Sequence, residues 1–523
     1  MPHTVLQLCK NIKMDRNYVN VCDDNMINVV GANYVKQFTR YSYIRQTQSI
    51  RVEVDASFSM EDVIECNYLS FINAQHENKR YYGWIDRIEY VNEKTVEIFF
   101  TLDYWSTYYP DLVKLPVFVE REHVNDDSFG ANSAPEPVKP DRLISNTVQK
   151  EYYSDYSIVM FYVPSQISAA DLAYSLNDRY YTYAMCHRYN CSQQGIAALQ
   201  SHLARSTGQP NANATILGLN VIPNDFFLAS QLTQVDQQIS ENSVVNKIIQ
   251  LAAPANLNAY VPVNKKCFCY PYNFLAVSNG NVEKIFKYEK FNLSLQGAGQ
   301  LKISAGVVPN GGATLYPLNY DNVAQENTAE SLDLGDLPMI VAAIDSYAAW
   351  QAQKSSGAVM QGIMSTLTGA LAGLVKGGAV GAAVGAGAGL MGGITGYITQ
   401  EEAARAEQDR AVGTNNVTLD MLNGLLGFTI AQRCAVRDDA IRIDRFFSQF
   451  GYNVSEVKQP NYTGRQHWNY VKINGSAGYG PFPEDARDKL NEILNKGTTI
   501  WHSHADLGDY FTGGTRMQNP IIV

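Results

Sequence analysis

Apolar and polar residues alternate along much of the first quarter of the chain. Residues 50–54 place isoleucine and valine at every second position, the pattern of a strand with one buried face. Residues 81–91 and 95–102 are equally rich in β-branched and aromatic residues and flank a short polar segment, 92–94. The pattern predicts a β-hairpin there and consecutive strands over residues 45–125.

A segment rich in proline, asparagine and aspartate follows this region. Residues 125–141 contain Pro135, Pro137 and Pro140. Proline lacks a backbone donor and fixes its own φ, so it interrupts helices and strands. We therefore expect a domain boundary in this segment.

Further strands are expected in the middle of the chain. Residues 158–163 form an apolar run, and residues 267–277 and 283–291 are joined through Asn279-Gly280. The Asn-Gly pair suits the tight turn of a hairpin. In this interpretation Cys267 and Cys269 are alternating strand residues, because zinc-ligand pairs normally have two or more residues between them.

Helices are expected where apolar residues recur three and four positions apart. This spacing occurs at residues 196–205, 235–251 and 339–353. Residues 300–335 are instead rich in glycine, asparagine and aspartate, which predicts mainly loops.

Residues 357–396 differ from the rest of the chain. They hold 13 of its 38 glycines, and from Ser355 to Gln400 the only charged residue is Lys376. Seven of these glycines recur at an unbroken interval of four residues. We predict that this segment acts at a membrane, through residues Gly357, Gly362, Gly369, Gly373, Lys376, Gly377, Gly378, Gly381, Gly385, Gly389, Gly393 and Gly396.

The physical chemistry of this segment depends on its surroundings. In water, each interior glycine disfavours a helix by about 1 kcal/mol relative to alanine, so seven disfavour it by about 7 kcal/mol. In lipid, unpaired backbone groups cost several kcal/mol each, which favours the helix. Glycine at every fourth position also lets helices approach closely. The segment is therefore expected to be loose in water and helical in lipid.

The length of the segment suits a hairpin. Lys376 and the two glycines after it separate 19 residues, 357–375, from 18 residues, 379–396. At roughly 1.5 Å per residue, either half nearly crosses a hydrocarbon core of about 30 Å. Two alternatives stay open: a permanent transmembrane anchor, and a glycine-rich helix packed inside a soluble core. The G-x-G-x-x-G match at 387–392 follows from local glycine richness, because no strand precedes it.

Composition narrows the function classes. The chain has 523 residues, and 41 basic against 51 acidic residues give a net charge of −10. A tight binder of nucleic acid phosphates needs a basic surface, so this class is disfavoured. The 33 tyrosines outnumber the 20 phenylalanines, which favours β-structure with half-exposed faces. The eight cysteines follow no hydrophobic signal segment, so we expect reduced thiols.

No motif supports catalysis, metal binding or a cofactor. His502 and His504, with Asp506 and Asp509, suit a structural role better than a metal site, because two histidines two apart also fit one strand face. Glu120 and Glu122 flank Arg121 in a strand-like segment and are expected to form ion pairs. The sequence therefore predicts no catalytic residue, no metal and no cofactor.

Several sequence blocks together resemble one protein family. They are Phe71-Ile72-Asn73-Ala74-Gln75, Asn78-Lys79 with Tyr81-Tyr82, Phe118 to Val124, Phe446 to Tyr452, Val457 to Asn461, Trp468 to Val471, and Ile493 to His502. In order and combination they resemble the tail knob, or distal tail tube, proteins of small short-tailed bacteriophages of the Bacillus podovirus type. The glycine-rich segment stands where that family carries its long hydrophobic loop. Residues 126–335 match no block of the family.

The resemblance implies a mainly β (α+β) fold, with tail-tube-like β domains assembled into a ring and a long Gly/Ala-rich loop inserted before the C-terminal segment. In this family resemblance, the loops of the subunits would plug the lumen of the ring and form a pore in the host membrane for DNA ejection. The expected partners are five further copies in a homohexamer, the upstream tail or lower collar protein, the host membrane, and double-stranded DNA in transit without specific binding. The expected location is the virion tail tip, after assembly in the host cytoplasm.

These expectations give a provisional domain plan. It consists of an N-terminal β tube domain, 1–125; a middle α+β region, 126–337; a helix with the hydrophobic loop, 338–430; and a C-terminal segment completing the tube, 431–523. Two other functions remain as alternatives. One is a membrane-anchored structural protein, and the other is a tail-associated cell-wall hydrolase.

Overall fold

The structure is a computed structural model that divides into two compact units, each treated by itself. Unit 1 comprises Met1–Asp141, Tyr260–Cys267 and Arg437–Val523, and unit 2 comprises Arg142–Ala259 and Phe268–Val436. The residues that the structure describes are 4–41, 43–46, 49–73, 78–152, 155–164, 174–176, 179–181, 185–207, 214–239, 246–278, 282–291, 299–305, 312–336, 339–341, 427–507 and 519–522.

A six-stranded sheet forms one part of unit 1. Its strand order is β3 (Tyr34–Tyr41), β1 (Thr4–Cys9), β5 (Tyr68–Asn73), β6 (Arg80–Asn92), β7 (Thr95–Leu102) and β4 (Ile50–Glu53). The expected hairpin is confirmed, since β6 and β7 pair antiparallel. Val96, Ile98 and Phe100 alternate toward the core, as a one-sided strand requires.

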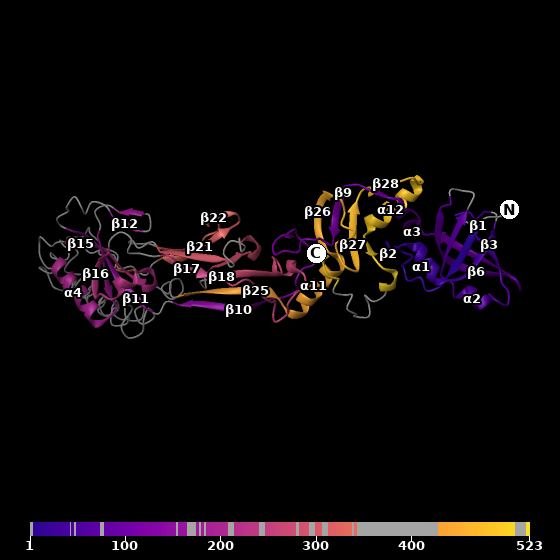
Figure 1. The fold of residues 1–523 in the computed structure, drawn as a ribbon. Coiled ribbons are helices and arrows are strands. Elements are labelled where there is room, and N and C mark those ends of the chain that lie inside the picture. The colour runs from indigo at the N-terminus through magenta and orange to yellow at the C-terminus, as the bar shows by residue number, and fades with distance from the viewer. Residues whose placement is uncertain are drawn as a thin grey trace, which may run out of the picture. The chain divides into compact units, whose positions relative to one another are not determined.

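A five-stranded sheet joins the two ends of the chain in unit 1. Its order is β2 (Asn20–Cys22), β29 (Thr498–Trp501), β27 (Trp468–Asn474), β9 (Val117–Glu122) and β26 (Tyr452–Lys458). In Figure 1 the purple β9 accordingly lies between the orange and yellow strands β26 and β27. A two-stranded ribbon pairs β8 (Val113–Lys114) with β28 (Gly478–Tyr479).

Helices cover parts of these sheets. Those of unit 1 are α1 (Met26–Asn33), α2 (Met60–Ile64), α3 (Tyr104–Tyr108), α11 (Arg437–Phe450) and α12 (Glu484–Lys496). Leu490 and Leu494 of α12 are buried in one apolar cluster with Val119, Val471 and Trp105. The spacing of four residues places both leucines on one helix face.

Unit 2 contains three larger sheets. The first has the order β10 (Leu143–Tyr152), β25 (Gly427–Ala435), β18 (Asn273–Ser278) and β19 (Glu283–Phe286). The second has the order β16 (Asp236–Ile239), β14 (Met185–Asn190), β11 (Tyr156–Pro164), β15 (Ala214–Pro223) and β24 (Met339–Val341). The third has the order β17 (Lys247–Gln250), β20 (Gln300–Ala305), β21 (Gly312–Tyr320) and β22 (Val323–Glu326), with β23 (Leu332–Asp336) also paired to β21.

The remaining elements of unit 2 are short or helical. They are the ribbon of β12 (Tyr174–Leu176) with β13 (Arg179–Tyr181), and the helices α4 (Gln193–Thr207) and α5 (Ala229–Leu232). The strand predicted at 158–163 and the helix predicted at 196–205 are therefore confirmed. The hairpin of β18 and β19 is confirmed as well.

Two helix predictions in unit 2 disagree with the structure where it describes them. The helix expected at 235–251 is replaced by β16 and β17, which pair with β14 and β20. This stretch is rich in β-branched valine and isoleucine, which fit a sheet edge well. Of the helix expected at 339–353, Met339–Val341 is a strand instead, and residues 342–353 lie outside the described residues.

The segment 300–335 is not mainly loop. It contains β20 to β23, and its glycines and asparagines separate short strands. Leu301 and Ile303 alternate with polar residues and are buried, as are Ala313 and Leu315. The short alternating pattern was masked by the turn residues around it.

The expected strand position of Cys267 and Cys269 is also wrong. Both thiols are buried, but Cys267 lies in the 3₁₀ helix η4 (Lys265–Phe268) and the strand begins only at Asn273. The segment 125–141, in contrast, contains neither helix nor strand, as its prolines indicated. The four-part domain plan stays a prediction.

Gly451 offers a direct test of the junction after α11. Its φ is +64°, and a Cβ there would lie 2.1 Å from the Glu122 carbonyl oxygen of β9. We expect Gly451→Ala to destabilise the protein by about 2 kcal/mol or more, measured by urea unfolding.

Gly31→Ala is the matched control for this substitution. Gly31 lies in α1 with nothing within 4 Å of the added Cβ, so alanine should be neutral or stabilise the protein by up to about 1 kcal/mol. Equal effects of the two substitutions would contradict the described junction.

Candidate functional site

The predicted membrane-active residues, Gly357 to Gly396, lie outside the described residues. The structure does describe the strands on either side of residues 342–426, which we call the insert. These are β24 before it and β25 after it, both in unit 2. Among the described residues, no helix combines the length and the apolar character needed to cross a membrane.

Strand β25, which follows the insert, is paired along both of its edges. Each residue from Gly427 to Ala435 is opposite a residue of β10, with one register shift. Residues Thr429 to Cys434 are also opposite residues of β18. Figure 1 shows β25 running beside β10 and β18. Because its backbone groups are bonded on both sides, β25 is a central strand.

Gln432 fixes the register of β25 through a buried cluster of amide side chains. Its Nε2 donates to Asn273 Oδ1 at 2.8 Å and to the Asn256 carbonyl at 3.1 Å. Its Oε1 accepts from Asn146 Nδ2 at 3.1 Å. Asn273, which is fully buried, donates in turn to the Phe268 carbonyl at 3.1 Å. A one-residue slip of β25 would leave these buried amides unpaired, so the cluster specifies one register.

Strand β24, which precedes the insert, is held differently. Its three described residues, Met339–Val341, pair with β15 among the described strands. Leu219 is opposite Val341 and Asn220 is opposite Met339, with a register shift between the two pairs. The described residues next to the insert are thus Met339–Val341, which pair with β15, and Gly427–Ala435, which pair with β10 and β18.

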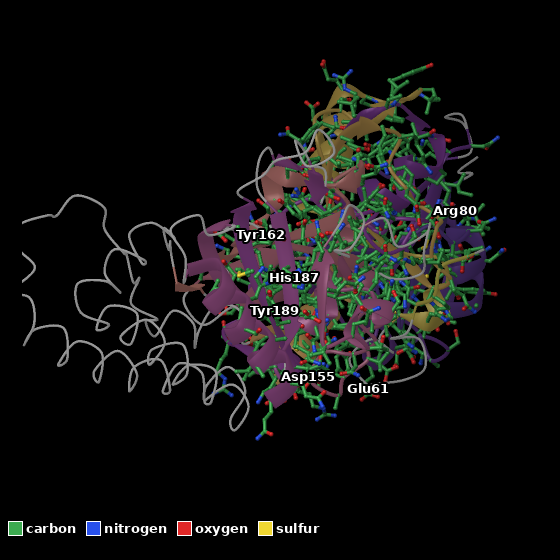
Figure 2. The ribbon with its side chains drawn as sticks, turned by 90° about the vertical axis from the view of Figure 1, so that its left-hand side faces the viewer. Glu61, Arg80, Asp155, Tyr162, His187 and Tyr189 are labelled. Carbon is green, nitrogen blue, oxygen red and sulfur yellow. The ribbon has the colours of Figure 1, made fainter. Side chains whose placement is uncertain are left out.

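An aromatic cluster supports the sheet that carries β24. Tyr162 of β11 and His187 and Tyr189 of β14 are labelled in Figure 2. The Tyr189 hydroxyl lies 2.6 Å from Nδ1 of His202 on α4, and the His187 and Tyr189 ring centroids are 4.8 Å apart. Burial lowers the pKa of His187, which the nearby Asp236 carboxylate opposes. The cluster packs α4 onto one face of the sheet.

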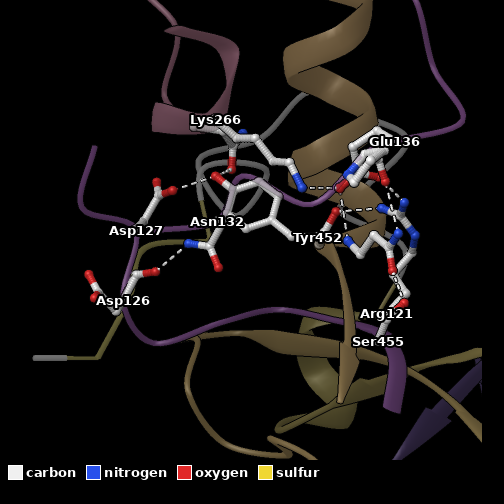
Figure 3. A network of polar contacts seen from close by, with 12 residues as sticks. Arg121, Asp126, Asp127, Asn132, Glu136, Lys266, Tyr452 and Ser455 are labelled. Atoms are coloured by element: carbon white, nitrogen blue, oxygen red, sulfur yellow. Dashed lines mark hydrogen bonds and ion pairs between the residues drawn. The ribbon is translucent and has the colours of Figure 1, made fainter. Parts of the chain in front are cut away.

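A buried ionic network in unit 1 holds the ends of the segments that lead to and from unit 2. Figure 3 shows Lys266 and Arg121 converging on the Glu136 carboxylate. The Glu136 side chain is 1% exposed, and its Oε1 also accepts from the Asn453 backbone amide at 2.8 Å. This network ties residues 125–141 and the segment Tyr260–Cys267 to β9 and β26.

A second carboxylate, Asp444 of α11, binds the segment Tyr260–Cys267. It accepts from the Tyr260 hydroxyl at 2.7 Å and from the backbone amides of Val263 and Asn264, each at 2.9 Å. Nearby, the Tyr452 hydroxyl donates to Asp127. Burial raises the pKa of the Asp127 carboxyl group. Asp444 therefore positions the backbone at Val263 and Asn264, and Asp127, which also accepts from the Lys265 backbone amide at 3.2 Å, positions the backbone beside them.

His123, directly after β9, bonds to both β27 and α11 as a single tautomer. Its Nδ1 accepts from the Tyr470 backbone amide at 2.9 Å, so Nε2 carries the proton and donates to the Ser448 carbonyl at 3.1 Å. Burial, aided by the positive charge of Arg465, lowers the pKa of His123 to about 3. The imidazole is neutral near pH 7 and serves as a structural connector.

The histidines and aspartates near the C-terminus, which the sequence suggested as structural residues and not as metal ligands, have protein partners where they are described. His502 contacts Asp23 Oδ2 at 3.1 Å, His504 Nε2 accepts from the Lys13 backbone amide at 3.2 Å, and Asp506 contacts His467 at 3.2 Å. Asp509 lies outside the described residues. Among the residues that the structure describes, no group of His, Cys, Asp and Glu is arranged to hold a metal ion.

The predicted ion pairs around Arg121 are present. Glu120 pairs with Lys472, Glu122 with Lys458, and Arg121 with Glu136. The amides of the Gln432 cluster, in contrast, gave no signal in the sequence. They come from four separate segments, and Asn146 and Gln432 are 286 positions apart.

The chain was compared with known families and proteins. Residues 232–513, more than half of the chain, match the family model described as Bacillus phage phi29, tail knob protein gp9, C-terminal domain. Residues 2–113 match the caudoviral major tail protein N-terminus.

Individual relatives agree with these matches. The chain is 22% identical over 531 residues to tail knob protein gp9 of Bacillus phage B103, covering 86% of this chain and 88% of the relative. It is 26% identical over 95 residues to tail knob protein gp9 of phi29, covering 18% of this chain and 16% of the relative. The solved structure of the bacteriophage C1 tail knob protein gp12 superposes with a TM-score of 0.64 at 13% identity, covering 99% of this chain and 100% of that chain. The last match supports the predicted mainly β fold.

The Glu136 network makes a measurable contribution to stability. We expect Glu136→Gln to destabilise the protein by about 3 kcal/mol, because it leaves Lys266 and Arg121 buried without their counter-charge. Urea unfolding monitored by tryptophan fluorescence measures this.

The control is Glu484→Gln on α12, where an 80% exposed carboxylate pairs with Arg487 at 2.6 Å. This exposed pair should contribute about 0–1 kcal/mol. A Glu136→Gln effect no larger than the Glu484→Gln effect would contradict a role for the network in stability.

Proposed function

Because the chain belongs to the family of the Bacillus phage phi29 tail knob protein gp9, we propose that its insert opens the host membrane during genome delivery. Tail knob proteins are structural components of the phage tail, so this chain is a virion tail protein. The membrane step is our proposal. It assigns to residues 357–396 the membrane-active role that their composition favours.

The sequence of the insert is the observation that carries the proposal. Lys376 is its only charge between Ser355 and Gln400, and its glycines keep one four-residue register from Gly369 to Gly393. Such a segment exposes apolar surface that a soluble particle must shelter from water. In lipid, burial of apolar area at roughly 25 cal/mol per Å² favours insertion. Lys376, at the tip of a hairpin, opposes insertion by about 3 kcal/mol.

The shelter that we propose is the lumen of a ring of six copies. The number six rests on the family resemblance, and ring symmetry lets several short segments line one conduit. In this proposal the inserts plug the lumen before infection and then leave it at the tail tip. The ring attaches to the upstream tail or lower collar protein.

The charge of the chain suits a passage for DNA. A net charge of −10 favours repulsion of phosphates, so double-stranded DNA can pass without binding. We propose no enzymatic activity, no metal and no cofactor. Peptidoglycan hydrolysis by the purified protein in a zymogram would instead support the cell-wall hydrolase alternative.

The glycine register can be tested in the full-length protein. We expect replacement of Gly377, Gly381 and Gly385 by leucine to reduce dye release from lipid vesicles by roughly tenfold, because bulky side chains prevent close helix contact. Replacement of the same three glycines by alanine is the control and should retain most of the activity, since alanine also permits close packing.

Absence of vesicle leakage by the wild-type protein at every pH tested would contradict the membrane role. Equal activity of the leucine and alanine variants would contradict the close-packing argument while leaving membrane activity in place.

The ring can be tested separately by electron microscopy. We expect class averages of the purified protein to show six-fold rings with a filled centre, because the insert is sheltered in the lumen. Deletion of residues 357–396 should empty the centre and keep the ring. Monomers, or rings with an open centre in the wild type, would contradict the proposed shelter.

A further inference from the structure

The second sheet of unit 2 carries a row of polar residues on one of its faces. The aromatic cluster of β14 packs the other face against α4, and Arg188 alternates with the residues of that cluster, so it lies on the opposite face. Register places Arg188 opposite both Gln237 of β16 and Val159 of β11, and Val159 opposite Asn220 of β15. Because directly opposite residues share a face, these four residues form one row across four strands.

Arg188 is a buried cation bonded only to neutral oxygens within the described part of the chain. The residue is 1% exposed. Its Nε donates to the Ser157 hydroxyl at 2.8 Å, and its Nη1 donates to the carbonyls of Gln231 at 2.7 Å and Gln234 at 3.3 Å. Among the described residues no carboxylate forms an ion pair with it, and its Nη2 has no hydrogen bond. A buried charge without a counter-charge is strongly destabilising, so the site favours an anion.

The groups around Arg188 supply little compensating charge. Burial lowers the pKa of the Arg188 guanidinium, because the charged form has lost its contact with water. The Cys191 thiol beside it is neutral near pH 7, since burial raises its pKa to about 12. The Phe227 ring centroid lies 5.7 Å from Arg188 Cζ, at a distance where a cation–π contact contributes weakly. The positive charge of Arg188 is therefore left for a bound group to neutralise.

Three amide side chains near Arg188 have buried atoms without a hydrogen bond. Asn220 is 0% exposed, and within the described part of the chain neither its Nδ2 nor its Oδ1 is bonded. The Oε1 atoms of Gln231 and Gln237 are also buried and unbonded there. Buried polar groups in native proteins nearly always have a partner, and those that do not mark a bound water or ion. The amides thus offer both a donor and acceptors to the group that neutralises Arg188.

The register also sets the size of the group that fits. Arg188 and Asn220 are separated by one strand, which puts their Cα atoms about 10 Å apart. Val159 stands between them and is shorter than Arg188, so a small ion placed over Val159 is within reach of both polar side chains. Gln237, at the other end of the row, is half-buried, so the row approaches the surface at β16.

From these observations we propose that this face of the sheet binds one small oxyanion that carries a hydroxyl hydrogen, of which free hydrogen phosphate is the simplest example. Arg188 Nη2 and Asn220 Nδ2 donate to its charged oxygens. The amide oxygens of Gln231 and Gln237 accept from its hydroxyl. A free ion fits better than a phosphate group within a polymer, because Asn220 is completely buried. The proposal does not depend on the membrane role of the insert.

Isothermal titration calorimetry of the full-length protein tests the site, in a phosphate-free buffer at a mildly alkaline pH where hydrogen phosphate predominates. We expect one inorganic phosphate to bind per subunit, with a Kd below about 1 mM. Sulfate has the same charge but no hydroxyl hydrogen, so it should bind at least about tenfold more weakly. Dimethyl phosphate imitates the phosphodiester of a polymer and should not bind measurably.

Two substitutions test the residues that hold the ion. Arg188→Lys removes the planar fork of donors and should weaken phosphate binding by at least about tenfold. Asn220→Asp places a carboxylate on the same face, which repels the anion and offers Arg188 a counter-charge, so it should weaken binding by at least about tenfold as well. The matched control is Arg433→Lys on β25, where a 38% exposed guanidinium pairs with Glu283 at 3.3 Å. It should leave the Kd unchanged.

Gln237→Leu provides a further test in case the variants at the two buried positions fail to fold. Gln237 is half-buried, so leucine is tolerated there more easily than at Arg188 or Asn220. The substitution removes one acceptor of the hydroxyl hydrogen and should reduce the preference for phosphate over sulfate. Urea unfolding of the wild type with and without phosphate gives a second measurement, since a ligand that binds the folded state raises the unfolding midpoint.

Each result decides one part of the proposal. A folded wild type that shows neither saturable phosphate binding nor a shifted unfolding midpoint would overturn the site. Phosphate binding that is unchanged in folded Arg188→Lys and Asn220→Asp variants would overturn its location. Equal affinity for sulfate would overturn the role of the amide oxygens, and equal affinity for dimethyl phosphate would overturn the preference for a free ion.

Discussion

Backbone pairing between strands that are far apart in the chain is the interaction on which this structure depends. In unit 1, β2 near the start of the chain pairs with β29 near its end, and β9 lies between β26 and β27. In unit 2, β25 lies between β10 and β18. Such pairing satisfies backbone groups that would be costly to bury alone. The strands on either side of residues 342–426, β24 and β25, belong to the same unit.

Buried polar groups decide which of these pairings are fixed. The Glu136 network and Asp444 hold the segments 125–141 and Tyr260–Cys267 in unit 1 through bonds to backbone and to cations. The Gln432 amides hold β25 in one register. A satisfied buried network specifies one arrangement, whereas an unpaired buried group opposes its own burial. Within the described part of the chain Asn220 is in the second situation, since neither atom of its side-chain amide has a hydrogen bond.

These features suit the problem posed by a lipid-competent segment in a tail protein. The segment must be available to a membrane and must not detach from the protein that carries it. The doubly paired strand β25, which directly follows the insert, meets the second requirement. The acidic charge balance and the tail knob family provide the setting in which such a segment would act.

The sequence by itself determined the features that depend on near neighbours. The β6–β7 hairpin followed from alternation around residues 92–94, the break at 125–141 from its prolines, and the unusual insert from its glycine register. The family blocks added the mainly β class. Only the tertiary structure decided that residues 236–250 and 300–336 form strands, because short apolar runs are compatible with helix, strand or loop until a partner strand is present. It alone brought together Asn146, Asn273 and Gln432, and left the Asn220 side chain without a hydrogen bond among the residues that the structure describes, because contacts between distant segments leave no periodic signal along the chain.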